Sequence, residues 1–400
     1  MLGRLPLVDL TYSPADQAFR AEVRGWLEEH LTGEWAALKG LGGAGRDHEA
    51  HEERVAWNRL LAEHGWTCLG WPTEHGGRGL SLVQQVIFHE EYARADAPGR
   101  VNHLGEELLG PTLIAFGTPE QQQRFLPRIV AVEDLWAQGY SEPDAGSDLA
   151  NVQTKARLVG DEWVIDGQKV WTSNAHLSQW AFVVCRTVPG STRHHGLSFL
   201  LVPLEQDGVE IRPIEQLTGG SEFNEVFFTG ARTAADLVVG EPGGGWRVAM
   251  ALLGFERGVS VLGQVVGFAR ELSGVVDLAR ETGAIDDPVL RDRLAALKVE
   301  LEVMRFQALR GLASNDAGSA SVFKLVWAGW HRRLGEVAMD VAGAGGLTAL
   351  PGSPEAPYQL DRWQRLFLFS RADTIYGGSD EVQRNILAER VLGLPKEARG

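Results

Sequence analysis

The sequence predicts an α+β protein with a helical N-terminal domain (residues 1–135), a central antiparallel β domain (136–242) and a C-terminal four-helix bundle (243–400). Apolar residues recur at helical spacing up to about residue 130 and again after residue 243. Between these regions, short β-branched runs are separated by turn residues. No helical pattern alternates with those runs, which excludes a doubly wound fold.

The composition narrows the class of protein. The 400 residues are 44% apolar and 23% charged, which is typical of a globular protein with a large core. A net charge of −15 argues against nucleic acid or an anionic membrane surface as the main partner. No stretch approaches the ~18 apolar residues of a membrane span, and the first residues do not resemble a signal peptide. Cys68 and Cys185 lie in separate apolar runs, so we expect reduced core thiols and a cytoplasmic protein.

Local signals place the N-terminal helices. Ser13 is suited to cap a helix that begins at Pro14, and further helices are expected over 82–94 and 119–130. The glycine run at 40–45 matches the pattern G-x-G-x-x-G, but it follows a helical pattern where a dinucleotide-binding loop requires a strand. We therefore expect a connection there and not a phosphate loop.

In the β domain, residues 163–165 and 169–171 flank Asp166-Gly167, which predicts a hairpin with a tight turn. Further strands are expected over 181–185, 197–202 and 225–228.

The bundle is predicted from four helices. The first runs through residues 250–262, and two others cover 322–341 and 382–391. The second is marked by apolar residues that step alternately by four and three: Leu290, Leu294, Leu297, Leu301, Met304 and Ala308.

The first bundle helix carries adjacent opposite charges, Glu256 and Arg257, between apolar and glycine residues. Burial raises the pKa of a carboxyl group towards the range that suits a general base. Adjacent helical residues point about 100° apart, so each is free to serve a different part of one bound molecule. The alternative is an amphipathic helix whose acid is ion-paired elsewhere.

Three polar segments together suggest a family. They are Gln138–Asp148 (QGYSEPDAGSD), Gly167–Asn174 (GQKVWTSN) and Ile375–Arg384 (IYGGSDEVQR). In this order and spacing they closely resemble the acyl-CoA dehydrogenase family, from about residue 13 to residue 395. The resemblance implies an FAD enzyme that converts an acyl-CoA thioester to the trans-2-enoyl-CoA and passes electrons to an electron-transfer flavoprotein. An oxidase on the same scaffold is the alternative enzyme.

The resemblance also implies roles for single residues. The positions matched to flavin contacts are Tyr140, Ser141, Trp171, Ser173, Ser379 and Glu381. Capping or turn hydrogen bonds account for serines at such positions equally well. The positions matched to the substrate are Ser147 near the CoA arm, Arg257 near the CoA nucleotide, and Tyr376 with Gly377. The backbone N–H of Gly377 matches a donor to the thioester oxyanion.

The expected base is Glu256. Many family members place the catalytic glutamate at the position of Gly377, which here has no side chain. The isovaleryl-CoA and long-chain branches place it on the first bundle helix, directly before the arginine matched by Arg257. A non-catalytic subunit is the alternative. The glycines of this helix, at 254, 258, 263 and 267, leave room for a wide acyl group or allow close helix packing.

Two features of homotetrameric relatives are missing. The segment 279–283 lacks the Arg-x-x-Phe-Gly motif that holds a neighbour's FAD diphosphate, and Asp340 stands where a glutamine is usual. A carboxylate repels a diphosphate unless a cation intervenes. The combination resembles the catalytic-type subunits of bacterial steroid side-chain acyl-CoA dehydrogenases, so we expect a homologous partner chain in a heterotetramer, with a homotetramer as the alternative. No metal site is expected, and His48, His51, His194 and His195 are expected to face solvent.

Overall fold

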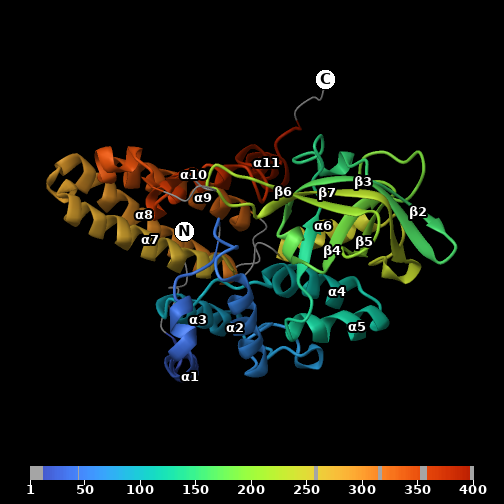
Figure 1. Cartoon of the computed structure of the whole chain (residues 1–400), viewed down its shortest axis with the longest axis horizontal. Helices are drawn as coiled ribbons and strands as arrows, with labels where there is room; N and C mark the ends of the chain where they lie inside the picture. The colour runs from blue at the N-terminus through green and yellow to red at the C-terminus, as the bar shows by residue number, and fades with distance from the viewer. Residues whose placement is uncertain (1–11, 44, 256–259, 314–317, 352–357, 397–400) are drawn as a thin grey trace, which may run out of the picture.

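The computed structural model of the chain describes residues 12–43, 45–255, 260–313, 318–351 and 358–396. The β domain lies at one end of the molecule and the long helices of the bundle lie at the other (Figure 1). The N-terminal helices pack below their junction (Figure 1). The predicted order of a helical, a β and a second helical domain is confirmed.

The N-terminal domain consists of short helices with strong local start signals. Ser13 caps the first of them through a capping box, and Ser81 and Thr118 cap two others in the same way. The glycine run after residue 40 follows a 3₁₀ helix and not a strand, as expected. The α-helices are α1 (Pro14–His30), α2 (His51–Glu63), α3 (Leu82–Arg94), α4 (Gly110–Phe116) and α5 (Pro119–Val130), with a 3₁₀ helix (Gly33–Leu38) and a π-helical segment (Leu104–Leu109).

The central domain is one seven-stranded sheet in the order β1-β4-β2-β3-β7-β6, with β5 paired to β4. Most pairs are antiparallel, as predicted, but β1 and β2 both run parallel to β4, so the sheet is mixed. The strands are β1 (Trp136–Gly139), β2 (Lys155–Val159), β3 (Glu162–Ser173), β4 (Trp180–Arg186), β5 (Leu197–Pro203), β6 (Val209–Ile214) and β7 (Phe223–Ala234).

The predicted hairpin at Asp166-Gly167 is wrong, because β3 runs straight through these residues. The tight turn lies earlier, at Gly160 and Asp161, where β2 and β3 pair on either side. At Asp166 the register with β7 shifts instead, and the Asp166 carboxylate accepts a hydrogen bond from the backbone N–H of Gly230 at 2.8 Å. The Asp-Gly pair therefore accompanies a β-bulge and does not close a turn.

The C-terminal domain contains the two predicted long helices, which are α8 and α9. The helix predicted through residue 256 is described as α6, which ends at Phe255, and α7, which begins at Ser260. The last predicted helix is shorter than expected and continues into a π-helical turn (Leu387–Val391), and α10 was not predicted. The helices are α6 (Gly245–Phe255), α7 (Ser260–Thr282), α8 (Pro288–Ala313), α9 (Ser319–Ala342), α10 (Arg362–Phe369) and α11 (Asp380–Ile386).

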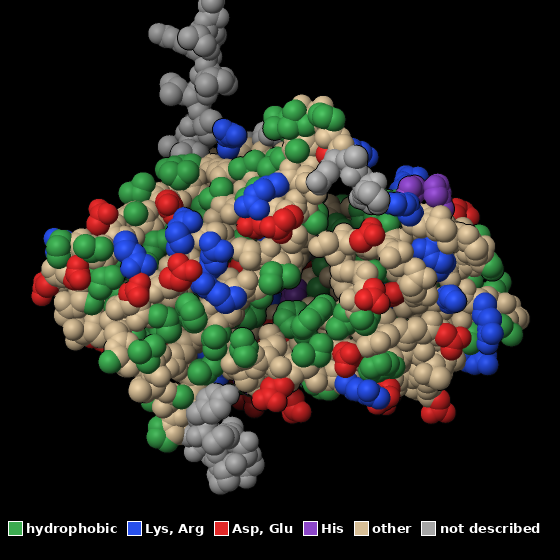
Figure 2. Space-filling view, turned by 90° about the horizontal axis from the view of Figure 1, so that it is seen from above, with side chains coloured by type: hydrophobic (Ala, Val, Ile, Leu, Met, Phe, Trp, Pro, Cys, Tyr) green, Lys and Arg blue, Asp and Glu red, His purple; other side chains and the backbone are tan. Residues whose placement is uncertain are grey.

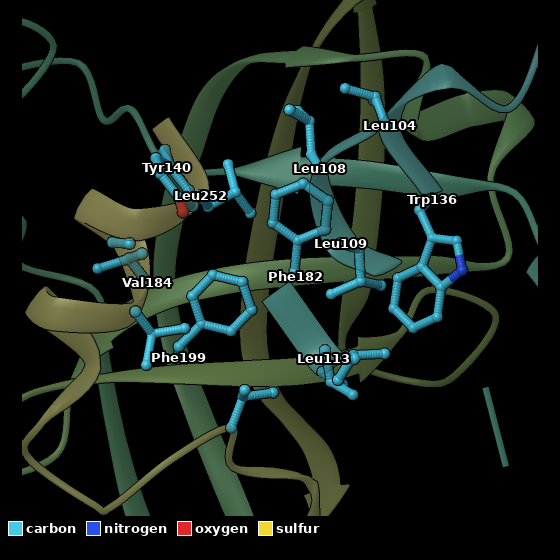
Figure 3. Packing of buried hydrophobic residues seen from close by; sticks show 14 of the residues in the cluster. Leu104, Leu108, Leu109, Leu113, Trp136, Tyr140, Phe182, Val184, Phe199 and Leu252 are labelled. Carbon is cyan, nitrogen blue, oxygen red and sulfur yellow. The ribbon is translucent and has the colours of Figure 1, made fainter. Parts of the chain in front are cut away.

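One apolar cluster joins the sheet to helices of both other domains (Figure 3). Phe182 and Phe199 stack at 5.7 Å on the sheet, and Leu109 of the N-terminal domain packs into the same cluster. Leu252 brings α6 onto the cluster beside Tyr140 (Figure 3). The last turn of α6 is thus fixed against the strand that leads into the first signature segment.

Both cysteines are free and buried, as predicted: Cys68 and Cys185. Among the described residues, no helix is long and apolar enough to cross a membrane.

Candidate functional site

The first signature segment, residues 138–148, continues from β1. The ring of Tyr140 is buried and packs edge-on to Phe182 with ring centroids 6.0 Å apart. The carbonyl of Ser141 accepts a hydrogen bond from the backbone N–H of Val170 at 2.9 Å. This bond fixes the first segment to the second, residues 167–174.

A buried ion pair lies where these two segments meet. The ammonium of Lys169 donates to Glu142 Oε1 at 2.8 Å. It also donates to the carbonyls of Tyr140 and Val184, at 2.9 and 2.7 Å. Burial raises the pKa of the Glu142 carboxyl, but Lys169 and two backbone N–H donors outweigh burial and hold that pKa below its ordinary value. The pair therefore locks the backbone on which the predicted flavin contacts stand.

Trp171 lies where the pairing of β3 with β7 is interrupted. Its backbone is left-handed, with φ 58°, and the residue is 57% exposed. The indole contacts Phe223 edge-on at 6.1 Å, and Ser173 ends the strand in a half-buried position. A large aromatic ring held at the surface by an uncommon backbone conformation is available to a ligand.

The third signature segment forms a tight loop before α11. The Tyr376 hydroxyl donates to Asp373 Oδ1 at 2.6 Å. Gly377 and Gly378 are both left-handed, with φ of 62° and 84°, a conformation that side chains resist. The side-chain amide of Gln383 donates to the carbonyls of these glycines at 3.2 and 3.4 Å.

Ser379 and Glu381 follow this loop at the start of α11. The Ser379 hydroxyl accepts from the Val382 N–H at 3.4 Å and so caps the helix, as one of the two interpretations of this serine expected. The Glu381 side chain is 77% exposed. Hydrogen bonds from its own backbone N–H and from Ser379 lower the pKa of Glu381. Ser147 is also exposed, in a turn before a 3₁₀ helix.

The loop at residues 40–50 lies between the β domain and the bundle. Asp47 accepts a hydrogen bond from the side chain of Asn174 at 3.0 Å, at the end of the second signature segment. On its other side, a Cβ at Gly45 would lie 2.7 Å from the ring of Phe369 in α10. Phe369 in turn packs with Tyr376 at 6.4 Å. This loop therefore connects the second and third signature segments.

The bundle also touches the β domain directly. Arg365 of α10 donates to the carbonyl of Thr218 at 2.9 Å, in the connection between β6 and β7. Figure 2 shows the surface hollowed where the bundle meets the β domain. The second and third signature segments thus both lie near this junction. Glu256 and Arg257 lie outside the described residues.

The positions expected to weaken the hold on a diphosphate are engaged in ion pairs. Arg293 Nη1 lies 2.6 Å from Asp340 Oδ2, and Arg280 pairs with Asp277 at 2.7 Å. A cation therefore does intervene at Asp340, and its repulsion of a diphosphate is weaker than the sequence alone indicates.

The expectation that four histidines face solvent is correct for three of them. His51 is half-buried and lines a small cavity with Asp47 and Arg54. Burial, followed by the charge of Arg54, lowers the pKa of His51. The other histidines considered are exposed, as expected: His48, His194 and His195. Within the described part of the chain, no group of three or more His, Cys, Asp or Glu is placed to hold a metal ion.

Sequence reasoning missed the residues that support the site. Lys169 and Gln383 lie inside the signature segments, yet their burial makes them clamps for the backbone. The sequence feature that could have revealed these two residues is a charged or amide side chain on an otherwise apolar strand or helix face. The buried His331, described below, also lies on an apolar helix face, but outside the signature segments.

Three family models match consecutive parts of the chain. They are the N-terminal domain of acyl-CoA dehydrogenase over residues 13–133, its middle domain over 137–231 and its C-terminal domain over 243–392.

Curated relatives match over nearly the whole length. The acyl-CoA dehydrogenase IpdE1 of Mycobacterium tuberculosis is 67% identical over 387 residues, covering 96% of this chain and 99% of the relative. IpdE1 of Mycolicibacterium smegmatis is 65% identical over 394 residues, with the same coverage.

Solved structures match the fold as completely. A structure titled Tcur3481-Tcur3483 steroid ACAD superposes with a TM-score of 0.83 at 31% identity, covering 97% of this chain and 100% of that one. The ChsE4-ChsE5 complex from Mycobacterium tuberculosis gives 0.80 at 30% identity, with the same coverage.

Proposed function

The chain belongs to the acyl-CoA dehydrogenase family and is an acyl-CoA dehydrogenase, and we propose that Glu256 is the base that removes the α proton of its thioester substrate. Loss of that proton and of a β hydride gives the trans-2-enoyl-CoA. The step requires a base, a donor to the thioester oxygen and a hydride acceptor.

The residues present fit FAD as that acceptor. Trp171 offers a 57% exposed indole at the junction, suited to pack on a flat ring, and Ser141 and Ser173 lie on the same clamped segments. FAD, when bound, supplies a flavin N5 atom that accepts the hydride. Tyr140, Ser141, Trp171, Ser173, Ser379 and Glu381 are the residues that we propose hold it.

The assignment of the base rests on what the Tyr376–Gly377 segment lacks. Gly377 has no side chain, and the carboxylate of nearby Asp373 is already bonded to Tyr376 and to His331. Of the two positions at which relatives place the base, Glu256 is therefore the one that carries a carboxylate. In the sequence it follows α6, whose Leu252 packs beside Tyr140 (Figure 3). The N–H of Gly377 would then stabilise the developing oxyanion, with Ser147, Arg257 and Tyr376 holding the rest of the acyl-CoA.

The test is a Glu256→Gln variant mixed with acyl-CoA in the absence of oxygen. We expect it to keep its flavin and bind acyl-CoA, but to fail to bleach the flavin absorbance. Glu210→Gln, an exposed glutamate in β6, is the control and should bleach normally. Bleaching by Glu256→Gln at the wild-type rate would rule out Glu256 as the base. Oxygen consumption with substrate present would identify an oxidase instead of a donor to electron-transfer flavoprotein.

We also propose that the active form is a heterotetramer with a homologous chain. Helix α8 buries one apolar face in the bundle, yet Val299, Val303 and Phe306 on another face are 64%, 56% and 50% exposed. A helix that is apolar on more than one face is usually buried on each of them. Two similar structures, Tcur3481-Tcur3483 and ChsE4-ChsE5, are each named for a pair of proteins.

Assembly is tested by co-expression with a homologous chain from the same organism. Val303→Glu should abolish co-purification, while Glu210→Gln should not. A fully flavin-loaded homotetramer from the chain alone would contradict the heterotetramer.

We propose a bulky acyl group, such as one derived from a steroid. Gly254 and Gly267 have no neighbour within 4 Å of an added Cβ, so these glycines do not serve close helix packing. Gly263 instead lies against His89 of α3, at 3.3 Å from its Cβ, and Gly258 is outside the described residues. Bleaching rates against acyl-CoAs of graded width test this proposal, which a preference for straight short chains would overturn.

A further inference from the structure

A buried histidine lies between two carboxylates in the bundle and has no part in the reaction proposed above. His331 of α9 is 7% exposed. Its Nδ1 lies 2.5 Å from Asp373 Oδ2 and its Nε2 lies 2.9 Å from Glu271 Oε2 of α7. Carboxylate oxygens only accept hydrogen bonds when ionised, so both ring nitrogens must carry protons to satisfy them. The side chain is therefore an imidazolium.

The charge is consistent with the surroundings. Burial lowers the pKa of an imidazole, but Glu271 and Asp373 outweigh it and raise the pKa of His331 to about 10. The ring of Phe268 covers the imidazolium at 4.6 Å.

The network continues from Asp373 into the C-terminal loop. The second oxygen of this carboxylate accepts from the Tyr376 hydroxyl at 2.6 Å. The Lys324 ammonium donates to the Asp373 carbonyl and lies 4.8 Å from the centre of the Tyr376 ring. A chain of polar contacts thus runs from α7, through α9, to the residue directly before Gly377.

The other side of Gly377 is held as well, because Gln383 donates to its carbonyl. The peptide plane that carries the Gly377 N–H begins at Tyr376. With the Tyr376 side chain held by Asp373 and the Gly377 carbonyl held by Gln383, the peptide group that carries this N–H is restrained on both sides.

We propose that His331, through Asp373 and Tyr376, is a positioning residue that aims the Gly377 N–H at the substrate's thioester oxygen. The proposal rests on the proposed function, in which this N–H stabilises the oxyanion. An oxyanion donor contributes about 10²–10³-fold to a rate, and small misplacements of a reacting group cost about 10²-fold. His331 does not contact the substrate itself.

The test compares His331→Gln with wild-type enzyme, in the assembled and FAD-loaded form. We expect kcat per bound flavin to fall about 10–100-fold, while KM and flavin content change by less than about 3-fold. Trp330→Phe is the matched control, because it removes a buried hydrogen bond from the same helix to the Leu297 carbonyl, away from the loop. It should lower stability but leave kcat per flavin unchanged.

A double-mutant cycle separates positioning from general support of the fold. Tyr376→Phe removes only the hydroxyl at the end of the chain, so His331→Gln and Tyr376→Phe should be strongly non-additive in kcat. Glu271→Gln keeps a hydrogen-bond acceptor for His331 but not the charge, and should give a smaller loss.

Additive effects in the cycle, or a kcat per flavin in His331→Gln equal to wild type, would overturn the proposal. If one of these results is found while Glu256→Gln is inactive, only the positioning role of His331 is wrong and the proposed function stands. An active Glu256→Gln would instead point to a failure of the proposed function.

Discussion

The two sides of the candidate site are held in different ways. On the β-domain side, strand pairing and the buried Lys169–Glu142 pair fix the backbone around Trp171. On the C-terminal side, individual side chains hold the Gly377 carbonyl and the Tyr376 hydroxyl, namely those of Gln383 and Asp373. The difference teaches that the side proposed to hold FAD is part of the fold itself. The side proposed to hold the oxyanion depends on individual side chains, so substitutions of those side chains should alter catalysis before they alter stability.

The largest effect is expected from removing the Lys169–Glu142 ion pair on the β-domain side. Lys169→Met leaves the buried Glu142 carboxylate without its ion-pair partner, which should cost roughly 3–5 kcal/mol in unfolding free energy and release FAD. The control is Arg232→Met, which breaks an exposed pair with Glu162 and should cost roughly 0–1 kcal/mol. Chemical denaturation measures both, and equal small losses would mean that the pair does not lock the segments.

The next effect uses pH on the C-terminal side. Because the folded-state pKa of His331 is raised to about 10, its stabilising contribution is complete below its ordinary value of 6.5. It is lost as pH rises from 6.5 through about 10, by roughly 1.4 kcal/mol per pH unit. His331→Gln should remove this slope in unfolding experiments between pH 7 and about 10. An identical slope in the variant would assign the effect to another group.

A smaller effect loosens the loop without changing its charges. At Gly378, with φ 84°, an added Cβ would lie 2.5 Å from Gln383 Nε2 and displace that amide from the Gly377 carbonyl. Gly378→Ala should cost roughly 1–2 kcal/mol and lower kcat at unchanged flavin content. Gly283→Ala has a similar φ of 79° but open space, so it should cost stability alone. A loss of kcat in both variants would contradict control of the loop by Gln383.

The smallest effect concerns the cap of α11. Ser379→Ala should cost roughly 0.5–2 kcal/mol, as should Ser81→Ala at the cap of α3. If Ser379 also contacts FAD, only Ser379→Ala should weaken FAD retention during gel filtration. Equal retention in both variants would leave Ser379 as a cap alone.

Elements with local signals were predictable from the sequence. Ser13 and Pro14 mark the start of α1, and the leucine spacing of α8 follows from burial of one face. The position of the hairpin turn could not be predicted from the sequence, because Gly160-Asp161 and Asp166-Gly167 are both turn signals. Only the pairing of β3 with β7 decides between them. The parallel pairing of β1 with β4 is also decided by partners distant in sequence.

The residues of the candidate site likewise fall into those that the sequence predicts and those that it does not. Trp171 and Tyr376 could be named because they stand in recognisable segments. The Glu271–His331–Asp373 contacts could not, because these residues are 60 and 42 positions apart and none lies in a motif. Likewise, only the folded chain places Arg293 beside Asp340.

The two buried thiols give the molecule built-in reporters of local opening. Burial raises the pKa of Cys185 to about 12 and raises that of Cys68 well above its ordinary value, so neither reacts readily in the closed state. One thiol lies in the N-terminal domain and the other on β4. The alkylation rate of each thiol would therefore measure how often its own domain opens locally, without an introduced label.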